Sequence, residues 1–172
     1  MSQETKERNL HVIVLSNKIE AEIAFLWFIE NAYRLGHTLG LCFFEKLKSS
    51  KNLLRQRGQI YDIRFKGRGR MGPSKRDNTQ TVKLIESYEK KCMDLKIPFI
   101  VFRGQTTKNI GHLVIDNAIK EKANSITIGS NYIVRHHFTG LSLTAYHIIH
   151  NSPIPVNVIP LPQKPIVLEK EL

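Results

Sequence analysis

The sequence predicts an α/β protein: a Rossmann-like, doubly wound open sheet of five parallel strands with helices on both faces. Short apolar runs typical of buried strands alternate along the chain with longer segments whose apolar residues recur at the three-and-four spacing of helices. Strands that alternate with helices form parallel βαβ units with right-handed crossovers, and such units build an open sheet. The 172 residues suit a single domain, which we expect to span residues 1–172.

Five strands are expected over residues 10–16, 37–44, 97–104, 125–130 and 153–162. Helices are expected over residues 19–36, 79–96, 106–123 and 141–152. Arg34 and Gly36 form a helix-stop signal for the first of these, and Ser142 is placed to cap the last. Prolines 160, 162 and 165 should end the last strand, because proline lacks the N–H group that a strand ladder requires. Residues 161–172 then form a C-terminal tail.

Composition and cysteine content favour a globular cytoplasmic protein. Hydrophobic residues make up 41% of the chain, and no apolar run approaches the roughly 20 residues that a membrane-spanning helix needs. The N-terminus lacks the basic start, apolar centre and cleavage site of a secretory signal. Cys42 and Cys92 have no CxxC spacing, so we expect ordinary reduced thiols.

The positive charge is concentrated in one segment. The chain has a net charge of +11, and residues 46–76 carry eleven lysines and arginines against Asp62 alone. Glycines and a proline in this segment predict a loop or insertion within the domain. Its arginines interleave with Tyr61 and Phe65, a mixture that suits contact with RNA or DNA through phosphates and stacked bases.

Two other interpretations of this basic insertion stay open. The same charge suits docking on an acidic protein surface, and it also suits a solvated loop without any partner. The residues expected to contact a nucleic acid or an acidic partner are Arg55, Arg57, Arg64, Lys66, Arg68, Arg70, Lys75 and Arg76.

Ligands of doubly wound sheets bind beyond the carboxyl ends of the strands, where the strand order reverses. This rule selects three loops in the chain, over residues 16–18, 104–106 and 129–131. Gly129, Ser130 and Asn131 suit a phosphate or ribose contact, and equally a tight turn between strand and helix. The free N–H groups at the start of the last helix offer a second place for an anion.

Three pieces of the chain resemble the universal stress proteins, a UspA-like family of adenine-nucleotide-binding domains with an adenine nucleotide alpha hydrolase-like fold. The pieces are VIVLSNKIEAEIAFLWFIENAYRLG, RGQTTKNIGHLVIDNAIKEKANSITIGS and NSPIPVNVIP. The resemblance covers about two thirds of the chain and leaves residues 46–76 unmatched. It implies the strand order 3-2-1-4-5 and a homodimer formed through the last strand.

The resemblance extends to part of the family's nucleotide site. ATP-binding members carry an aspartate after the first strand, and here that position is Ser16. Their glycine signature begins at Gly129, but its second glycine falls on Tyr132 and its third on Ser142. Gly140, two residues earlier, suits a shifted loop. The resemblance therefore implies ATP or AMP as a ligand, bound by Ser16, Gly129, Ser130, Asn131, Gly140 and Ser142, with no metal beyond a magnesium ion that accompanies the nucleotide.

Two functions follow from these patterns. The first is a regulatory or stress-response protein that binds an adenine nucleotide at an altered site. The second is an interaction module, or a subunit of a ribonucleoprotein or cytoskeletal assembly, that has lost the nucleotide and docks through its basic insertion. No paired carboxylates and no nucleophile motif mark a catalytic centre, so we expect a non-catalytic protein in both cases.

Overall fold

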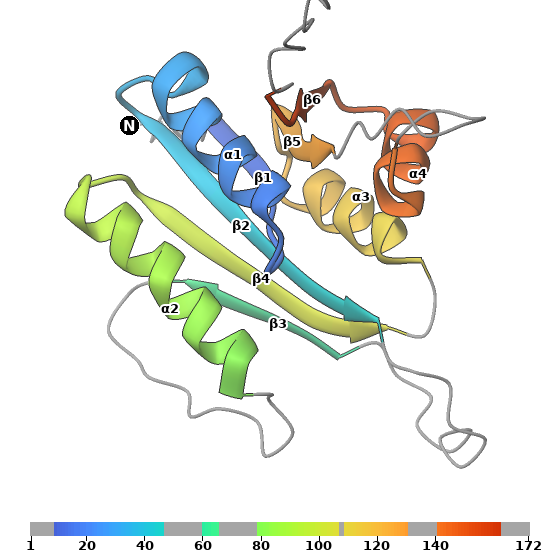
Figure 1. Cartoon of the computed structure of the whole chain (residues 1–172), viewed down its shortest axis with the longest axis horizontal. Coiled ribbons are helices and arrows are strands. Elements are labelled where there is room, and N and C mark those ends of the chain that lie inside the picture. Colours follow the sequence, from blue (N-terminus) through green and yellow to red (C-terminus); the bar gives the residue numbers. More distant parts are fainter. Residues whose placement is uncertain (1–8, 47–59, 66–78, 107–108, 131–140, 163–172) are drawn as a thin grey trace, which may run out of the picture.

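The computed structural model describes residues 9–46, 60–65, 79–106, 109–130 and 141–162, and these build one twisted sheet flanked by helices (Figure 1). The sheet has six strands in the order β3-β4-β2-β1-β5-β6. The strands are β1 (Asn9–Val14), β2 (His37–Lys46), β3 (Ile60–Phe65), β4 (Phe99–Thr106), β5 (Ser125–Ser130) and β6 (Val156–Pro160). The helices are α1 (Ile19–Trp27) with its π-helical continuation η1 (Phe28–Ala32), α2 (Thr79–Asp94), α3 (Ile110–Lys120) and α4 (Leu143–Asn151).

The five predicted strands are parallel and arranged as expected. β1 pairs in parallel with β2 and β5, β2 pairs with β4, and β5 pairs with β6. Numbered along the chain, these five strands follow the order 3-2-1-4-5, which confirms the predicted α/β fold class. The four predicted helices are also present, each shorter than its expected span.

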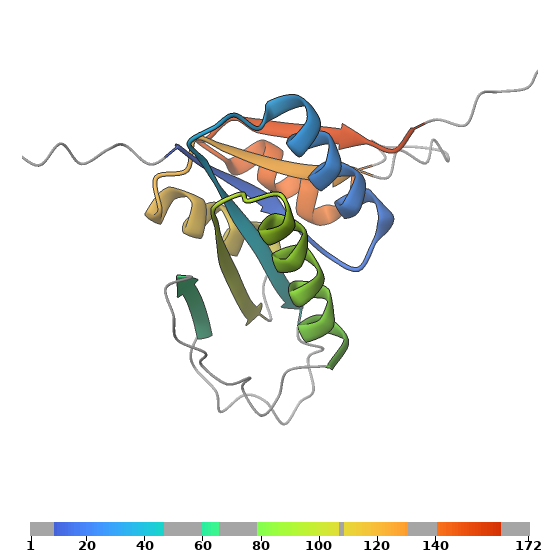
Figure 2. The ribbon, with the colours of Figure 1, turned by 90° about the vertical axis from the view of Figure 1, so that its left-hand side faces the viewer.

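The sixth strand, β3, lies inside the segment that the sequence assigns to a loop. It pairs antiparallel with β4, with Ile60 opposite Gln105 and Phe65 opposite Ile100 (Figure 2). One of the three predicted ligand loops, at residues 104–106, is wrong, because these residues belong to β4. Pairing with β2 as far as Thr106 and with β3 on the other side supplies hydrogen bonds that extend this strand.

Two hydrophobic layers hold the helices against the sheet. On one face, α1 and α2 bury Phe25, Phe28 and Tyr88 against Ile13 and Leu41 of the central strands. On the other face, α3 and α4 pack on a second set of side chains from the same strands; this set is Leu10, Val12, Cys42, Ile100, Phe102, Ile126 and Ile128. Because successive strand residues point to opposite faces, β1, β2 and β4 each contribute side chains to both layers.

Both cysteines of the chain lie in the core as free thiols. Cys42 and Cys92 are buried and unpaired, and burial raises the pKa of the Cys92 thiol to about 12, so it stays protonated. Within the described ranges, no helix is both long and apolar enough to cross a bilayer.

The α1 layer yields a test of the core. Phe25 is fully buried and meets Tyr88 of α2 edge-to-face, with ring centroids 5.1 Å apart. We expect Phe25→Ala to lower the free energy of unfolding by about 3–5 kcal/mol, because it leaves a cavity between α1, α2 and the sheet. Its neighbour Leu26 is 44% exposed, and Leu26→Ala should cost less than about 1 kcal/mol. Urea denaturation of both variants measures the difference, and equal losses would contradict this packing.

Candidate functional site

Strand β1 lies inside the sheet, and its carboxyl end lies near the middle of the carboxyl edge. It has β2 on one side and β5 on the other, and the chain leaves it toward α1. The strand order reverses at this point, since β2 and β4 continue in one direction and β5 and β6 in the other. A doubly wound sheet opens a crevice at such a reversal, so the carboxyl ends of β1, β2 and β5 mark the candidate site.

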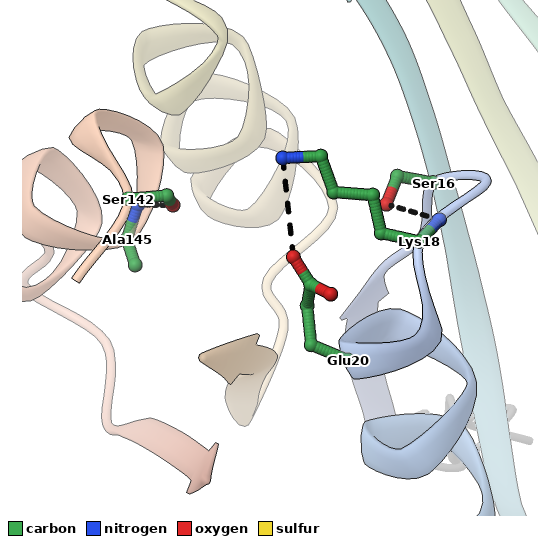
Figure 3. Close-up of polar contacts among 5 residues, drawn as sticks. All are labelled: Ser16, Lys18, Glu20, Ser142 and Ala145. Atoms are coloured by element: carbon green, nitrogen blue, oxygen red, sulfur yellow. Dashed lines mark hydrogen bonds and ion pairs between the residues drawn. The ribbon is translucent and has the colours of Figure 1, made fainter. Parts of the chain in front are cut away.

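The turn between β1 and α1 presents a serine, a lysine and a glutamate. Ser16 is half-buried, and its Oγ accepts a hydrogen bond from the backbone N–H of Lys18 at 3.3 Å. The Lys18 side chain is 66% exposed, and its ammonium lies 3.9 Å from a carboxylate oxygen of Glu20 (Figure 3). The ion pair is long and the Lys18 side chain is largely exposed, so this side chain can also reach an anion at the carboxyl edge of the sheet.

Gly129 and Ser130, both predicted to contact a ligand, are the last two residues of β5 and are buried. A Cβ at position 129 would overlap the Glu20 carbonyl in the first turn of α1 and lie 3.1 Å from the Ala21 nitrogen. Glycine is therefore required here for close packing of β5 against α1. The same close packing holds the β1–α1 turn beside the end of β5.

Ser142 caps α4, as the sequence predicts. Its Oγ accepts a hydrogen bond from the backbone N–H of Ala145 at 3.1 Å, and its own backbone is extended. The cap satisfies one N–H of the first turn and leaves others directed beyond the helix, where the helix dipole favours an anion. Figure 3 shows Ser142 on α4, separate from the turn that carries Ser16 and Lys18.

Helix α4 is placed by a close contact with α3. A Cβ on Gly111 would lie 2.8 Å from the His147 ring, so a glycine lets the two helices approach. The rings of His112 and His147 have centroids 4.1 Å apart. Desolvation, followed by repulsion from His112, lowers the pKa of His147, which keeps its ring neutral near pH 7. His147 therefore adds no positive charge to this side of the molecule.

A cavity of about 520 Å³ opens between the β1–α1 turn, the end of β2 and the start of α2. Its volume falls within the range of about 300–1,000 Å³ that small-molecule sites occupy. Apolar side chains and polar side chains both contribute to its lining; they are Leu15, Phe43, Phe44 and Leu84, and Ser16, Asn17, Glu45, Gln80, Thr81 and Lys83. A planar apolar ligand with polar groups at its edge fits such a lining.

Sequence reasoning missed one polar group of this cavity that hydrogen bonds hold in place, the Glu45 carboxylate. Thr81 of α2 donates a hydrogen bond to its Oε1, and the Gln105 side chain of β4 donates to its Oε2 at 3.2 Å. The prediction ended the second strand at Phe44, whereas β2 continues to Lys46. The available signal was an acidic residue directly after an apolar strand, in a fold that binds ligands at strand ends.

Several predicted residues lie outside the described part of the chain. Among the expected nucleotide contacts these are Asn131 and Gly140, and Tyr132 lies there too. Of the basic residues expected to meet a partner, only Arg64 falls on a described element, the strand β3. The remaining basic residues, from Arg55 to Arg76, lie outside the described ranges, so their role stays a prediction.

Metal binding has no candidate within the described ranges. No group of three or more His, Cys, Asp or Glu side chains there is placed to hold an ion.

Solved structures with the same fold come from bacteria, plants and archaea. A universal stress protein family member from Burkholderia pseudomallei aligns with a TM-score of 0.59 and 10% identity, covering 89% of this chain and 96% of that one. An Arabidopsis thaliana member with AMP bound gives a TM-score of 0.60 and 11% identity, covering 90% and 92%. The chain has the universal stress protein fold.

A universal stress protein from Archaeoglobus fulgidus in complex with dAMP aligns over 88% of this chain and 98% of that one, with a TM-score of 0.52 and 13% identity. No protein-family model and no curated protein matches the sequence. At identities this low, the universal stress protein likeness is a likeness of fold. The predicted resemblance is confirmed at that level.

The packing of Gly129 predicts a stability effect. Gly129→Ala places its Cβ against the backbone of α1, where no flexible side chain can move aside. We expect the free energy of unfolding to fall by about 1–3 kcal/mol, the usual cost of overpacking. Urea denaturation measures this loss. A variant as stable as the parent would show that β5 and α1 are not in this close contact.

Proposed function

We propose that this chain is a cytoplasmic, non-catalytic regulatory protein that binds an adenine nucleotide at the carboxyl edge of its sheet. The observation that carries this proposal is the cavity beside Ser16, next to the strand at which the sheet order reverses. Two structures with the same fold hold AMP and dAMP. A nucleotide in this chain would place its base in the cavity, with its phosphate toward Lys18 and the first turn of α4.

The chemistry of the two regions supports this orientation. Apolar walls from Leu15, Phe43 and Phe44 suit a purine ring. A phosphate is favoured at the other end, where the start of α4 offers backbone N–H groups and Lys18 offers a positive charge. The site departs from the family signature at Ser16 and at Tyr132, so we expect AMP, with the smaller phosphate group, to bind at least as well as ATP.

Native mass spectrometry with AMP tests this function. We expect a one-to-one adduct with the parent protein, and binding at least tenfold weaker for Asn17→Trp, because Asn17 is an exposed residue at the wall of the cavity. Asn124→Trp is the matched control, since Asn124 is also exposed and lies just before β5, at the opposite edge of the sheet. A parent protein that takes up no AMP would contradict the proposal, as would equal affinities of the two variants.

We also propose that β6 pairs with a second copy of the chain. Among the described strands, β6 is hydrogen-bonded to β5 alone, so its other edge is free to pair. An apolar groove runs beside it, lined by Ile23 and Trp27 of α1 and by residues 158–162. A strand edge and an adjoining apolar surface together favour a symmetric dimer.

Light scattering on a size-exclusion column tests the dimer. At micromolar concentration we expect a mass twice the 19.8 kDa of one chain. A monomer under these conditions would contradict pairing through β6.

A further inference from the structure

The Glu45 carboxylate is the one acidic group that lines the 520 Å³ cavity within the described ranges. It is half-buried at the end of β2 and is held from two directions, by Thr81 of α2 and by Gln105 of β4. Both contacts come from neutral donors. Among the described residues, no lysine or arginine forms an ion pair with it.

This arrangement leaves the carboxylate able to accept further hydrogen bonds. Each carboxylate oxygen has two lone pairs, and each receives one hydrogen bond from the part of the chain that the structure describes. The two donors also fix the orientation of the group, because they come from different elements on either side. Such a fixed acceptor, which has no ion-pair partner among the described residues, favours a ligand that presents N–H or O–H groups and disfavours one that presents a carbonyl oxygen or a phosphate.

The position of Glu45 in the sheet indicates which end of a nucleotide it meets. The order β2-β1-β5 separates its strand from Gly129 by two strand spacings, roughly 10 Å at the usual separation of neighbouring strands. A nucleoside monophosphate bridges a span of this size with its phosphate at one end and its base at the other. With the phosphate beside α4 and β5, the base reaches Glu45 in the cavity.

We propose that Glu45, positioned by Thr81 and Gln105, determines the specificity of the site by accepting a hydrogen bond from the exocyclic amine of adenine. This inference rests on the proposed function. Hypoxanthine and guanine carry a carbonyl oxygen at the same ring position, and that oxygen would face the carboxylate without a proton between them. A site built to receive a donor rejects an analogue that lacks it.

Equilibrium binding of AMP and IMP tests the assignment, because the two nucleotides differ at this ring position. We expect the parent protein to bind AMP at least tenfold more tightly than IMP, as a hydrogen bond to a charged group implies. Glu45→Gln should bring the two affinities to within about threefold of each other, because an amide can accept from the adenine amine or donate to the hypoxanthine carbonyl.

Glu22→Gln is the matched control. Glu22 lies on the exposed side of α1, paired with Lys91 at 2.8 Å, and does not line the cavity. The preference for AMP should be unchanged in this variant. Thr81→Val is a second variant for the same binding measurement, and it leaves the charge of Glu45 in place. It removes one of the two donors that hold the carboxylate, and we expect it to reduce the preference for AMP by at least threefold.

The outcomes separate the two proposals. If the parent protein binds neither nucleotide, the proposed function fails and the specificity assignment fails with it. If the parent binds AMP and IMP equally, or if Glu45→Gln weakens both to the same extent, the assignment of Glu45 is overturned while nucleotide binding stands. Tighter binding of GMP than of AMP would also overturn it, because guanine lacks the amine at that position.

Discussion

The hydrogen bonding of β1 to a parallel strand on each side is the constraint on which the rest of the molecule depends. Residues 9–14 pair with β2 over their full length, and His11 to Val14 pair with β5. Because the chain must leave this central strand at its carboxyl end, the β1–α1 turn falls between the ends of β2 and β5. The cavity, Ser16 and Lys18 are all located by that one arrangement.

Close packing at two glycines places the helices against the sheet and against each other. Gly129 lets the end of β5 contact the first turn of α1, and Gly111 lets α3 contact α4. These two contacts set how closely α1 packs on β5 and how closely α4 packs on α3. Gly129, which the sequence suggests as a phosphate contact, also has a structural role, because a side chain at this position would overlap the backbone of α1. Its contact with a phosphate stays a prediction, because the packing requirement alone accounts for a glycine at this position.

The sequence predicts the framework well because that framework depends on local patterns. The limits of β5 are those predicted, and Ser142 caps α4 as expected from its place before an amphipathic segment. β3 was missed because its partner β4 lies more than 30 residues further along the chain, and no local pattern identifies an antiparallel neighbour at that separation. Pairing with β3 as far as Gln105 and with β2 as far as Thr106 extends β4 through residues 104–106, which local turn signals place in a loop.

The polar interior of the cavity was not predictable for a related reason. Glu45, Thr81 and Gln105 come from β2, α2 and β4, and only the fold brings them together. Each is unremarkable in its own segment: an acid after a strand, a threonine early in a helix, and a glutamine near a strand end. Their hydrogen bonds turn an ordinary surface carboxylate into a fixed acceptor at the edge where this fold binds ligands.

We propose that one nucleotide lies across the end of β1, between β2 and the start of α4. An NMR titration of the amide resonances with AMP tests it most directly, because it locates the ligand without altering the protein. We expect the largest chemical-shift changes in the amide resonances of residues 15–18, of Phe44 and Glu45, and of the first turn of α4. The resonance of Asn124, at the amino edge of the sheet, should change little. Shifts confined to β6 or to the amino edge of the sheet, or no shifts at all, would contradict it.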